Sequence, residues 1–510
     1  MTPPAELSLA LVLVSTTRGA DVTTLSEPVN VGSEQTGKAF VLALALYFAA
    51  QVVIRVAQLD GLEWDEAESV FFAQEITLGY GSQPPLYVWL QWLFFEVFGT
   101  GHVGLSLLKN ALLFMLYGSV FGLARQLLGS LAASAIAASL VLIVPLGWEA
   151  QMDRSHSILA TALAAAALWT YFALLRQPGT ARRMLLGLLL GLGMQSKYNF
   201  VIFLLGLAMA SLAVPAHRKV IWTRDIWITI AVATLCLLPH GFWFVQQFQT
   251  ATQDTLNKMN DGNVYSSYTV SVQTGVKNLI YSIVSYITPL WIALVAAYRS
   301  PRQARPHLHT PDARLFLWLY VGGLACITVL IFSGQLAHTK SRWLQTLLFS
   351  LPLACFVWFP PQQATVYRRL LVYAAVCGGM ITIVLGLRPY VQSAFGRHPR
   401  INQPYPELSN EIARRFPGVG TIVVPDRIVG GNLHIQPPHF RVRLPGELCR
   451  DTPAGTGKVL VLLQPGSKFH PNGCLKEVIE AGQMAVRSRE VPVESLLFDY
   501  ALVLHGARPR

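Results

Sequence analysis

The chain has 510 residues, of which 53% are hydrophobic and only 13% are charged, and its mean hydropathy is +0.44. Soluble globular proteins carry about 25% charged residues, so this composition excludes an ordinary soluble enzyme. The 25 Phe, 17 Tyr and 12 Trp also exclude a disordered chain. We therefore interpret the net charge of +12 as a record of membrane topology and expect no nucleic-acid partner.

The apolar stretches predict an α-helical polytopic membrane protein with about eleven transmembrane helices. Most of the stretches are near the roughly 20 residues that a helix needs to cross a bilayer. The candidates are 39–57, 103–124, 131–148, 157–175, 184–196, 198–214, 226–246, 277–297, 315–333, 343–359 and 370–390.

Charge assigns the sides of the membrane. Basic residues gather in every second connection, where the only acids are Asp225 and Asp312. By contrast, residues 57–102 contain seven acids and no Lys or Arg. The positive-inside rule places the basic connections in the cytoplasm. They hold Arg125, Arg176, Arg182, Arg183, Arg218, Lys219, Arg224, Arg299, Arg302, Arg305, Arg314, Arg368 and Arg369.

The segment 184–214 is long for one span and short for two, because 31 helical residues extend about 46 Å. Basic pairs flank it on both sides, at Arg182–Arg183 and Arg218–Lys219. Since both pairs belong in the cytoplasm, the segment must cross twice. We predict two short spans that meet at an outward tip around 196–199.

The same count divides the chain into three parts. Residues 1–38 form a flexible cytoplasmic tail without the basic region of a signal peptide, and 39–390 form the transmembrane domain. Residues 391–510 form a small α/β domain in the periplasm. Strands are predicted at 421–424, 440–444 and 458–464, and a helix at 407–416.

Four of the six cysteines lie in predicted spans, where cysteine behaves as a small apolar residue. Cys449 and Cys474 lie in the predicted periplasmic domain, and the periplasm is oxidising. These two are a disulfide candidate. No cysteine spacing suits a zinc cluster, and we predict no metal, although a divalent cation is not excluded.

The first outer loop carries the most informative acids. Asp65 and Glu66 lie between Trp64 and an apolar stretch, so partial loss of solvation raises their basicity. We interpret this pair as catalytic. For Asp60, Glu63 and Glu68 we favour acids that merely face solvent, since outer loops avoid Lys and Arg.

Two further stretches contribute candidates. Pro84-Pro85 ends the first loop, and the apolar helix that follows, 86–98, is predicted to lie along or dip into the outer surface; Gln83 and Tyr87 flank this point. A short turn between spans holds Asp153, Arg154 and His156. An Asp153–Arg154 ion pair or a helix cap is the structural alternative to a functional acid here, and a hydrogen-bonded structural residue is the alternative for His156.

Cations on the predicted outer side are scarce. A cation close to hydrocarbon costs about 2.5–3.5 kcal/mol, so each one implies an anion. Lys197, Lys340 and Arg342 come from separate spans at one side and depth, which favours a shared phosphate ligand. For Lys109 and Lys277 the alternative is an ammonium that reaches the lipid headgroups.

Four motifs in this order resemble the polyprenyl-phosphate-sugar-dependent GT-C glycosyltransferases. They are Trp64-Asp65-Glu66-Ala67, Gln83-Pro84-Pro85-Leu86, Gly193-Met194-Gln195-Ser196-Lys197-Tyr198, and Lys340-Ser341-Arg342-Trp343-Leu344 running on to Pro352. The resemblance covers most of residues 40–390. It extends to protein O-mannosyltransferases, lipid A aminoarabinose transferases and lipopolysaccharide galacturonosyltransferases.

The resemblance implies an inverting transfer from a lipid-phosphate sugar at the outer face of the bacterial inner membrane. It implies catalytic roles for Asp65, Glu66 and Asp153. Gln83 departs from the aminoarabinose transferases, which carry Lys before the two prolines. The residues implied to bind the donor phosphate are Lys197, Lys340, Arg342, Arg154 and Lys109, and those that position the acceptor or the loop are Gln83, Tyr87, His156 and Tyr198.

The partners implied are a polyprenyl-phosphate-linked sugar and an envelope acceptor, with lipid A or lipopolysaccharide core favoured over protein. A transporter or flippase is the rival from another class. No internal repeat with Gly- or Pro-broken segments in two halves supports transport. A structural membrane anchor would not require membrane-embedded cations from several spans.

Overall fold

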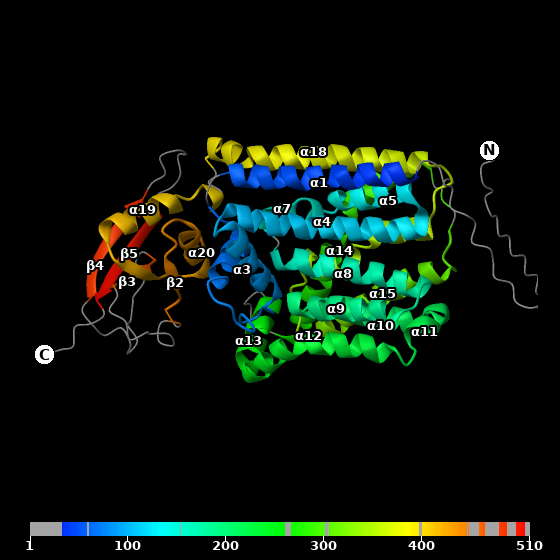
Figure 1. Ribbon diagram of the computed structural model, residues 1–510, viewed down its shortest axis with the longest axis horizontal. Coiled ribbons are helices and arrows are strands. Elements are labelled where there is room, and N and C mark those ends of the chain that lie inside the picture. Colours follow the sequence, from blue (N-terminus) through cyan, green and yellow to red (C-terminus); the bar gives the residue numbers. More distant parts are fainter. Residues whose placement is uncertain are drawn as a thin grey trace, which may run out of the picture.

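The structure is a computed structural model. It describes residues 33–58, 61–153, 155–260, 267–300, 304, 306–396, 400–445, 447, 458–464, 479–486 and 496–504. Long helices lie side by side in one bundle, and a small sheet with two helices lies beyond one end of it (Figure 1). We call the part from Arg400 to Leu504 the C-terminal unit.

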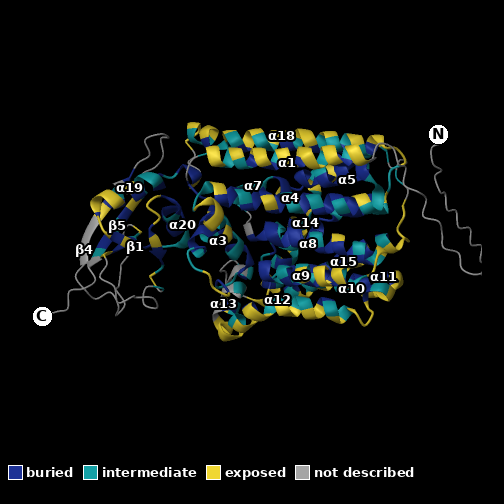
Figure 2. Ribbon diagram, in the orientation of Figure 1, coloured by how far each residue is buried: buried dark blue, intermediate teal, exposed yellow. Residues whose placement is uncertain are grey.

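Seven helices of the described residues are long and apolar enough to cross a membrane. Several of them expose large apolar side chains on their outward faces, such as Val53, Val245 and Met380, each at least 60% exposed (Figure 2). Such faces are stable only against lipid, so the chain is a multi-span membrane protein. The seven are α1 (Ser33–Ala57), α4 (His102–Leu128), α8 (Ser155–Arg176), α12 (Ile226–Gln246), α14 (Tyr268–Tyr298), α15 (Pro311–Phe332) and α18 (Thr365–Ala394).

The other four predicted spans are helical but shorter or broken, so the number eleven stays a prediction. Prolines begin new helical pieces at Pro145, Pro215 and Pro352, because proline fits the first turn of a helix but not its interior. The pieces are α5 (Ser130–Ala138), η1 (Ser139–Leu142), α6 (Val144–Gly147), α9 (Thr180–Ser196), α10 (Phe200–Ala213), α11 (Pro215–Ile221), α16 (Gln345–Leu348) and α17 (Leu351–Trp358).

The tip between α9 and α10 is held by close helix packing on both flanks. A Cβ added at Gly187 would lie 2.4 Å from the Thr229 carbonyl oxygen of α12. On the other flank, a Cβ at Gly206 of α10 would lie 2.7 Å from the Leu319 carbonyl oxygen of α15. Small residues let backbones approach this closely in membranes. The packing therefore fixes where the tip emerges.

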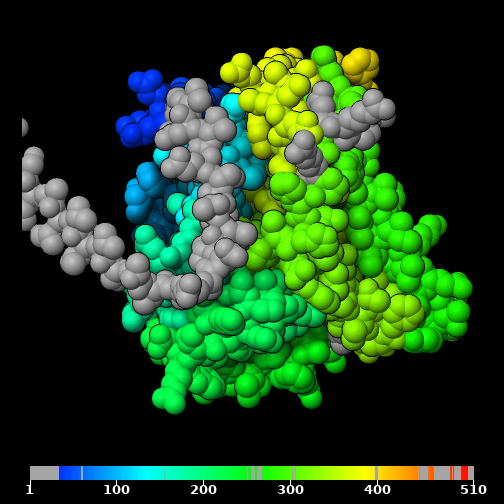
Figure 3. All heavy atoms as spheres, turned by 90° about the vertical axis from the view of Figure 1, so that its right-hand side faces the viewer, coloured from blue at the N-terminus to red at the C-terminus, as the bar shows by residue number. Residues whose placement is uncertain are grey.

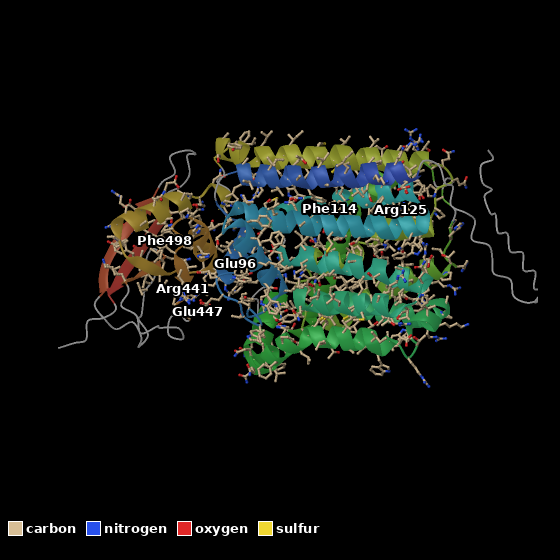
Figure 4. All side chains as sticks on the ribbon, viewed as in Figure 1. Glu96, Phe114, Arg125, Arg441, Glu447 and Phe498 are labelled. Atoms are coloured by element: carbon tan, nitrogen blue, oxygen red, sulfur yellow. The ribbon has the colours of Figure 1, made fainter. Side chains whose placement is uncertain are left out.

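The two ends of the bundle differ in charge. Arg125 lies at the end away from the C-terminal unit, whereas Glu96 lies near that unit (Figure 4). The connection bearing Arg218 and Lys219, in α11, also lies at the far end (Figure 1). Figure 3 looks onto this far end, where segments from the blue to the yellow part of the chain meet. Arg125 and the basic helix α11 thus share one side, and which side faces the cytoplasm stays a prediction.

Short elements cluster at the end of the bundle next to the C-terminal unit, with α3 and α13 clearest in Figure 1. Each of them contributes a buried or partly buried side chain to a core cluster of the bundle or of the unit. They are α2 (Trp64–Phe72), α3 (Leu86–Phe98), α7 (Glu149–Asp153), α13 (Phe248–Met259) and η3 (Ser341–Trp343).

The C-terminal unit is built on a five-stranded sheet of order β2-β1-β3-β5-β4. β1 pairs in parallel with β2 and β3, and β5 pairs antiparallel with β3 and β4. Three strands and α19 lie where the sequence predicts them; β4 and β5 were not predicted. Cys449 and Cys474 lie outside the described residues. The elements are η4 (Arg400–Asn402), α19 (Tyr405–Arg415), β1 (Val419–Val423), α20 (Arg427–Ile435), β2 (Arg441–Arg443), β3 (Lys458–Leu463), β4 (Ile479–Val486) and β5 (Leu496–Leu504).

Because α9 packs closely on α12, an alanine at Gly187 should destabilise the protein more than an alanine at an open glycine does. Gly187→Ala should lower the melting temperature in detergent, because overpacking costs about 1–3 kcal/mol. Gly379→Ala is the matched control, since a Cβ on this α18 glycine meets nothing within 4 Å. It should be neutral or slightly stabilising through helix propensity. Equal melting temperatures for the two variants would contradict the observed packing.

Candidate functional site

One cavity of about 450 Å³ opens among α2, the α9–α10 tip and the loop before α16. Three cations, Lys197, Lys340 and Arg342, share its wall with the carboxylates of Asp65 and Glu68. Another part of the wall is apolar and includes Ile202 of α10 and Leu336 of the loop after α15. The cavity can therefore receive an anionic ligand that also carries an apolar portion. Its other described lining residues are Ser82, Gln83, His156, Tyr198, Asn199, Val201, Thr255, Met259, Leu330 and Trp343.

Side chains of α14 hold the loop that carries Lys340 and Arg342. Asn278 donates to the Ala337 carbonyl at 2.9 Å, and Ser282 donates to the Thr339 carbonyl at 2.6 Å. The buried Nε of Arg342 has no hydrogen-bond partner among the described residues. A buried donor without a partner is costly, and an anion in the cavity is a suitable acceptor for it.

The α9–α10 tip is tied to both neighbours of the cavity. Asn199 donates to the Trp343 carbonyl at 3.2 Å, which joins the tip to η3. Lys197 donates to Ser157 Oγ at 2.6 Å, next to His156 at the start of α8. These contacts bring the two cationic segments together, although they lie more than 140 residues apart in the sequence.

Tyr198 and Gln83 belong to a second set of contacts that shapes the cavity rim. The Tyr198 hydroxyl lies 3.2 Å from His240 Nε2, and His240 Nδ1 lies 2.7 Å from the Leu78 carbonyl. Because a carbonyl only accepts, Nδ1 carries the hydrogen and the tyrosine donates to Nε2. Gln83 closes a turn through two 3.0 Å backbone hydrogen bonds with Tyr80. Gly81, at φ +59°, supplies the left-handed conformation that this turn requires.

Asp65 lies in the first turn of α2, with its side chain in the cavity wall. Its backbone N–H donates to Asp153 Oδ1 at 2.6 Å, so α7 caps the helix that carries Asp65. Burial, together with the charge of Asp65, raises the pKa of Asp153 to about 8. Asp153 is not among the described cavity-lining residues. It lies behind Asp65 and can orient it.

Glu66 and Lys109 belong to a buried network of ion pairs. Glu66 is 1% exposed, and it accepts from Lys109 Nζ at 2.7 Å and from Arg55 at 2.9 Å. Burial alone would raise the pKa of Glu66, but the two cations hold it well below its usual range. Because Lys109 is 2% exposed and engaged by Glu66 and the Gln151 carbonyl, it is committed to this buried network. The phosphate contact implied for Lys109 and the catalytic role implied for Glu66 stay predictions, and the contacts of both residues in this structure are with each other and with Arg55 and the Gln151 carbonyl.

The interpretation of Glu63 and Glu68 as acids that merely face solvent is wrong. Glu63 is 7% exposed, and its carboxylate lies 3.1 Å from Arg388 of α18. Glu68 lines the cavity and pairs with Arg427 of α20 at 2.9 Å. Both acids thus connect α2 to distant parts of the chain. Asp60 lies outside the described residues.

Tyr87 is 1% exposed and packs against the His156 ring, with centroids 4.8 Å apart. It supports His156 from behind. Arg154 lies outside the described residues, and so does the Asp153–Arg154 ion pair that was the structural alternative to a functional Asp153.

Three arginines that the sequence did not single out lie in or after the first and last long helices and contact the first loop. Arg55 near the end of α1 and Arg388 near the end of α18 both contact acids of the first loop. Arg400 stacks over Trp64, with its Cζ 4.3 Å from the ring centroid. The signal was present, because an arginine in the outer turn of a span is itself an expensive cation that implies an anion.

The described residues contain no group of three or more His, Cys, Asp or Glu side chains placed to hold a metal ion. The polar groups around the cavity include three cations, two carboxylates, two amides, the His156 ring and the hydroxyl groups of Ser82, Tyr198 and Thr255. Such a set suits an anion that carries a sugar. The chemistry that the residues themselves can supply is base catalysis at Asp65 and charge stabilisation by the cations.

Comparisons with known proteins show what the chain is similar to. Residues 82–243 match the family described as dolichyl-phosphate-mannose-protein mannosyltransferase. The chain is 34% identical over 399 residues to the lipopolysaccharide core galacturonosyltransferase RgtB of Rhizobium johnstonii, covering 76% of this chain and 79% of that protein. It is 28% identical over 224 residues to the lipid A galacturonosyltransferase RgtD of the same organism, covering 44% and 46%.

Among solved structures, the chain is similar to ArnT from Cupriavidus metallidurans bound to undecaprenyl phosphate. The TM-score is 0.58 at 12% identity, and the match covers 93% of this chain and 100% of that one. At this identity the likeness speaks for the fold alone. It extends over the bundle and into the C-terminal unit.

The buried network around Glu66 predicts a large loss of stability when one cation is removed. Lys109→Met should lower the unfolding free energy by about 3–5 kcal/mol, because Glu66 keeps its burial but loses a partner. A thermal melt in detergent measures this. Combining the change with Glu66→Gln should recover part of the loss.

The matched control is Lys38→Met, whose partner Glu34 lies four residues away on α1 with both side chains more than 70% exposed. An exposed pair contributes about 0–1 kcal/mol, so this variant should melt like the wild type. A Lys109→Met protein that does the same would show that the buried pair is not needed for folding.

Proposed function

The chain belongs to the GT-C glycosyltransferases, and from this premise we propose that it moves galacturonic acid from a polyprenyl phosphate onto the lipopolysaccharide core. That it is a membrane glycosyltransferase follows from the relatives and the fold. The sugar, the lipid donor, the acceptor and the periplasmic side of the bacterial inner membrane belong to the proposal.

The single observation that carries the proposal is the shared cavity. Lys197, Lys340 and Arg342 come from two distant segments and meet Asp65 in one wall. A donor with a phosphate and a uronic carboxylate carries two negative charges, and three cations suit this load. The volume of about 450 Å³ is in the range of small-molecule sites.

A neighbouring groove supports a lipid-linked donor. Its volume is about 410 Å³, and its lining between α12 and α13 is mainly apolar, with Leu237 and Phe244 among its residues. It shares Tyr198 and Thr255 with the cavity. A polyprenyl chain can lie in this groove while its phosphate remains beside the cations.

The proposed reaction asks for one proton transfer and one displacement. Asp65 takes the proton of an acceptor hydroxyl, whose oxygen forms a bond to the anomeric carbon while the bond from that carbon to the phosphate oxygen breaks. Attack from the opposite face inverts the configuration. Lys340, Arg342 and Lys197 stabilise the charge that develops on the leaving phosphate.

The neighbours of Asp65 serve its position in this scheme. Asp153 caps α2 at the Asp65 amide, and the Glu66 network fixes the depth of the helix. Since general-base help requires the carboxylate within hydrogen-bond reach of the acceptor, orientation matters as much as basicity. His156 and Gln83 lie in the same wall and can contact the sugar hydroxyls.

A protein acceptor is the second candidate, because residues 82–243 match a protein mannosyltransferase family. The relatives with the longer matches act on lipopolysaccharide according to their names, which supports the glycolipid. Mass spectrometry of core oligosaccharide and lipid A from a deletion strain separates the two. A missing uronic acid residue supports the glycolipid, and an unchanged glycolipid profile favours a protein.

The direct test is transfer by the purified protein in detergent, with polyprenyl-phosphate galacturonic acid and core acceptor. Asp65→Asn should lower kcat by about 10²–10⁴-fold, because the acceptor is a hydroxyl that needs a base. Asp225→Asn is the control, since that acid precedes α12, is not among the described lining residues of the cavity, and keeps its side chain 67% exposed beside Arg183. Full transfer by the Asp65→Asn protein would remove Asp65 from the mechanism.

A further inference from the structure

We propose that α20 of the C-terminal unit completes the catalytic cavity, by fixing the position of α2 and by neutralising Glu68 in the cavity wall. The inference rests on the proposed function, in that it takes the cavity around Asp65 as the site of transfer. It assigns the C-terminal unit a part in catalysis and makes Arg427 a positioning and specificity residue.

The first support is the closeness of the two helices. A Cβ added at Gly431 would lie 2.0 Å from the carbonyl oxygen of Ala67, and one at Gly430 would lie 2.7 Å from the Phe71 ring. The α20 backbone therefore rests directly on α2, with no room for a side chain. Ala67 is two residues beyond Asp65 on the same short helix.

Hydrogen bonds fasten both ends of this contact. The side chain of Asn432, 1% exposed, accepts from the Leu62 N–H at 2.8 Å just before α2. The Gly61 N–H donates to the Ile401 carbonyl at 3.1 Å. Beyond the other end of α2, Glu75 pairs with Arg441 and Arg443 of β2. A nine-residue helix held at both ends moves as one body, so a shift of α20 shifts Asp65.

The second support is charge. Glu68 lines the cavity three residues beyond Asp65, and Arg427 Nη1 lies 2.9 Å from its carboxylate. Arg427 also lies over the Phe72 ring, with its Cζ 4.7 Å from the ring centroid, which limits its freedom. A carboxylate in the wall repels an anionic donor unless a cation offsets it. Arg427 provides that cation from the C-terminal unit.

A unit that merely stabilises the fold would act on melting temperature and not on kinetics. The helix contact and the Arg427 charge should instead each change a different kinetic constant. Displacement of α2 should affect kcat, because reacting groups are misplaced. Loss of the Arg427 charge should affect the KM for the donor.

The first experiment compares two glycines of the C-terminal unit in the full-length protein. Gly431→Ala should lower kcat by at least about tenfold, since a misplacement near 1 Å can cost 10²-fold. Gly420→Ala of β1 is the matched control, because a Cβ there meets nothing within 4 Å. It should keep wild-type kcat. Equal kcat for the two folded variants would overturn the positioning role.

The second experiment leaves the α2–α20 backbone contact intact and removes the charge of Arg427 together with its stacking on Phe72. Arg427→Gln should raise the donor KM about five- to tenfold, and Glu68→Gln in the same chain should restore it, as expected for a coupled pair. Arg414→Gln is the control, since Arg414 lies on α19 and pairs only locally with Glu411 among the described residues. An unchanged KM in Arg427→Gln, or a double variant no better than the single one, would overturn the charge role.

The outcomes keep this inference apart from the proposed function. If the wild-type protein transfers no uronic acid, the proposed function and this inference are both contradicted. Only the inference is contradicted if the wild type transfers the sugar, Gly431→Ala has the same kcat as Gly420→Ala, and Arg427→Gln has the same donor KM as Arg414→Gln. If Gly431→Ala does not fold, the Arg427 series still decides the matter, because it adds no atoms to the helix contact.

Discussion

A single buried carboxylate, that of Glu66, fixes the first turn of α2 against the helix bundle. Glu66 of α2 accepts from Arg55 of α1 and from Lys109 of α4, so two long helices meet one short helix at its first turn. Removing three charged groups from water is expensive, and only their mutual pairing offsets this cost. The arrangement therefore specifies one position for α2. Asp65, the next residue, inherits that position, and the cavity wall depends on it.

Two other acids near α2 also pair with arginines from distant parts of the sequence. Glu63 contacts Arg388 of the last long helix, and Glu68 contacts Arg427 of the C-terminal unit. Three acids of one loop thus reach four parts of the chain, while Asp65 is left in the cavity wall. The ion pairs of these three acids thus fix the position of the segment that carries Asp65. This explains why the loop concentrates so many carboxylates in a chain with few charges.

Much of this could be predicted from the sequence, because membranes impose strong rules. Apolar length and the placement of arginines predicted the helical bundle and the paired short helices at 184–214. The scarcity of outer cations singled out Lys197, Lys340 and Arg342, which the structure brings together. Pairwise chemistry could not be predicted. Glu66 resembles Asp65 in sequence, yet only the fold shows that the first is buried against cations and the second lines a cavity.

Two further features could not be predicted for the same physical reason. Lys109 lies near the start of a span, where sequence cannot distinguish an ammonium facing a ligand from one facing a buried acid. The strands β4 and β5 were missed because β5 pairs with β3, which lies well before it in the sequence, and β4 pairs with β5. Non-local partners decide such elements, and periodicity within a short window does not reveal them.

The claim on which the rest depends is that cations from separate segments form one anion site beside Asp65. Equilibrium binding of undecaprenyl phosphate to the purified protein tests it most directly. Lys340→Gln and Arg342→Gln should each weaken binding about tenfold, the loss expected for a hydrogen bond to a charged group. Lys277→Gln, on an exposed face of α14, should bind like the wild type. Equal affinity in all three variants would contradict the shared site.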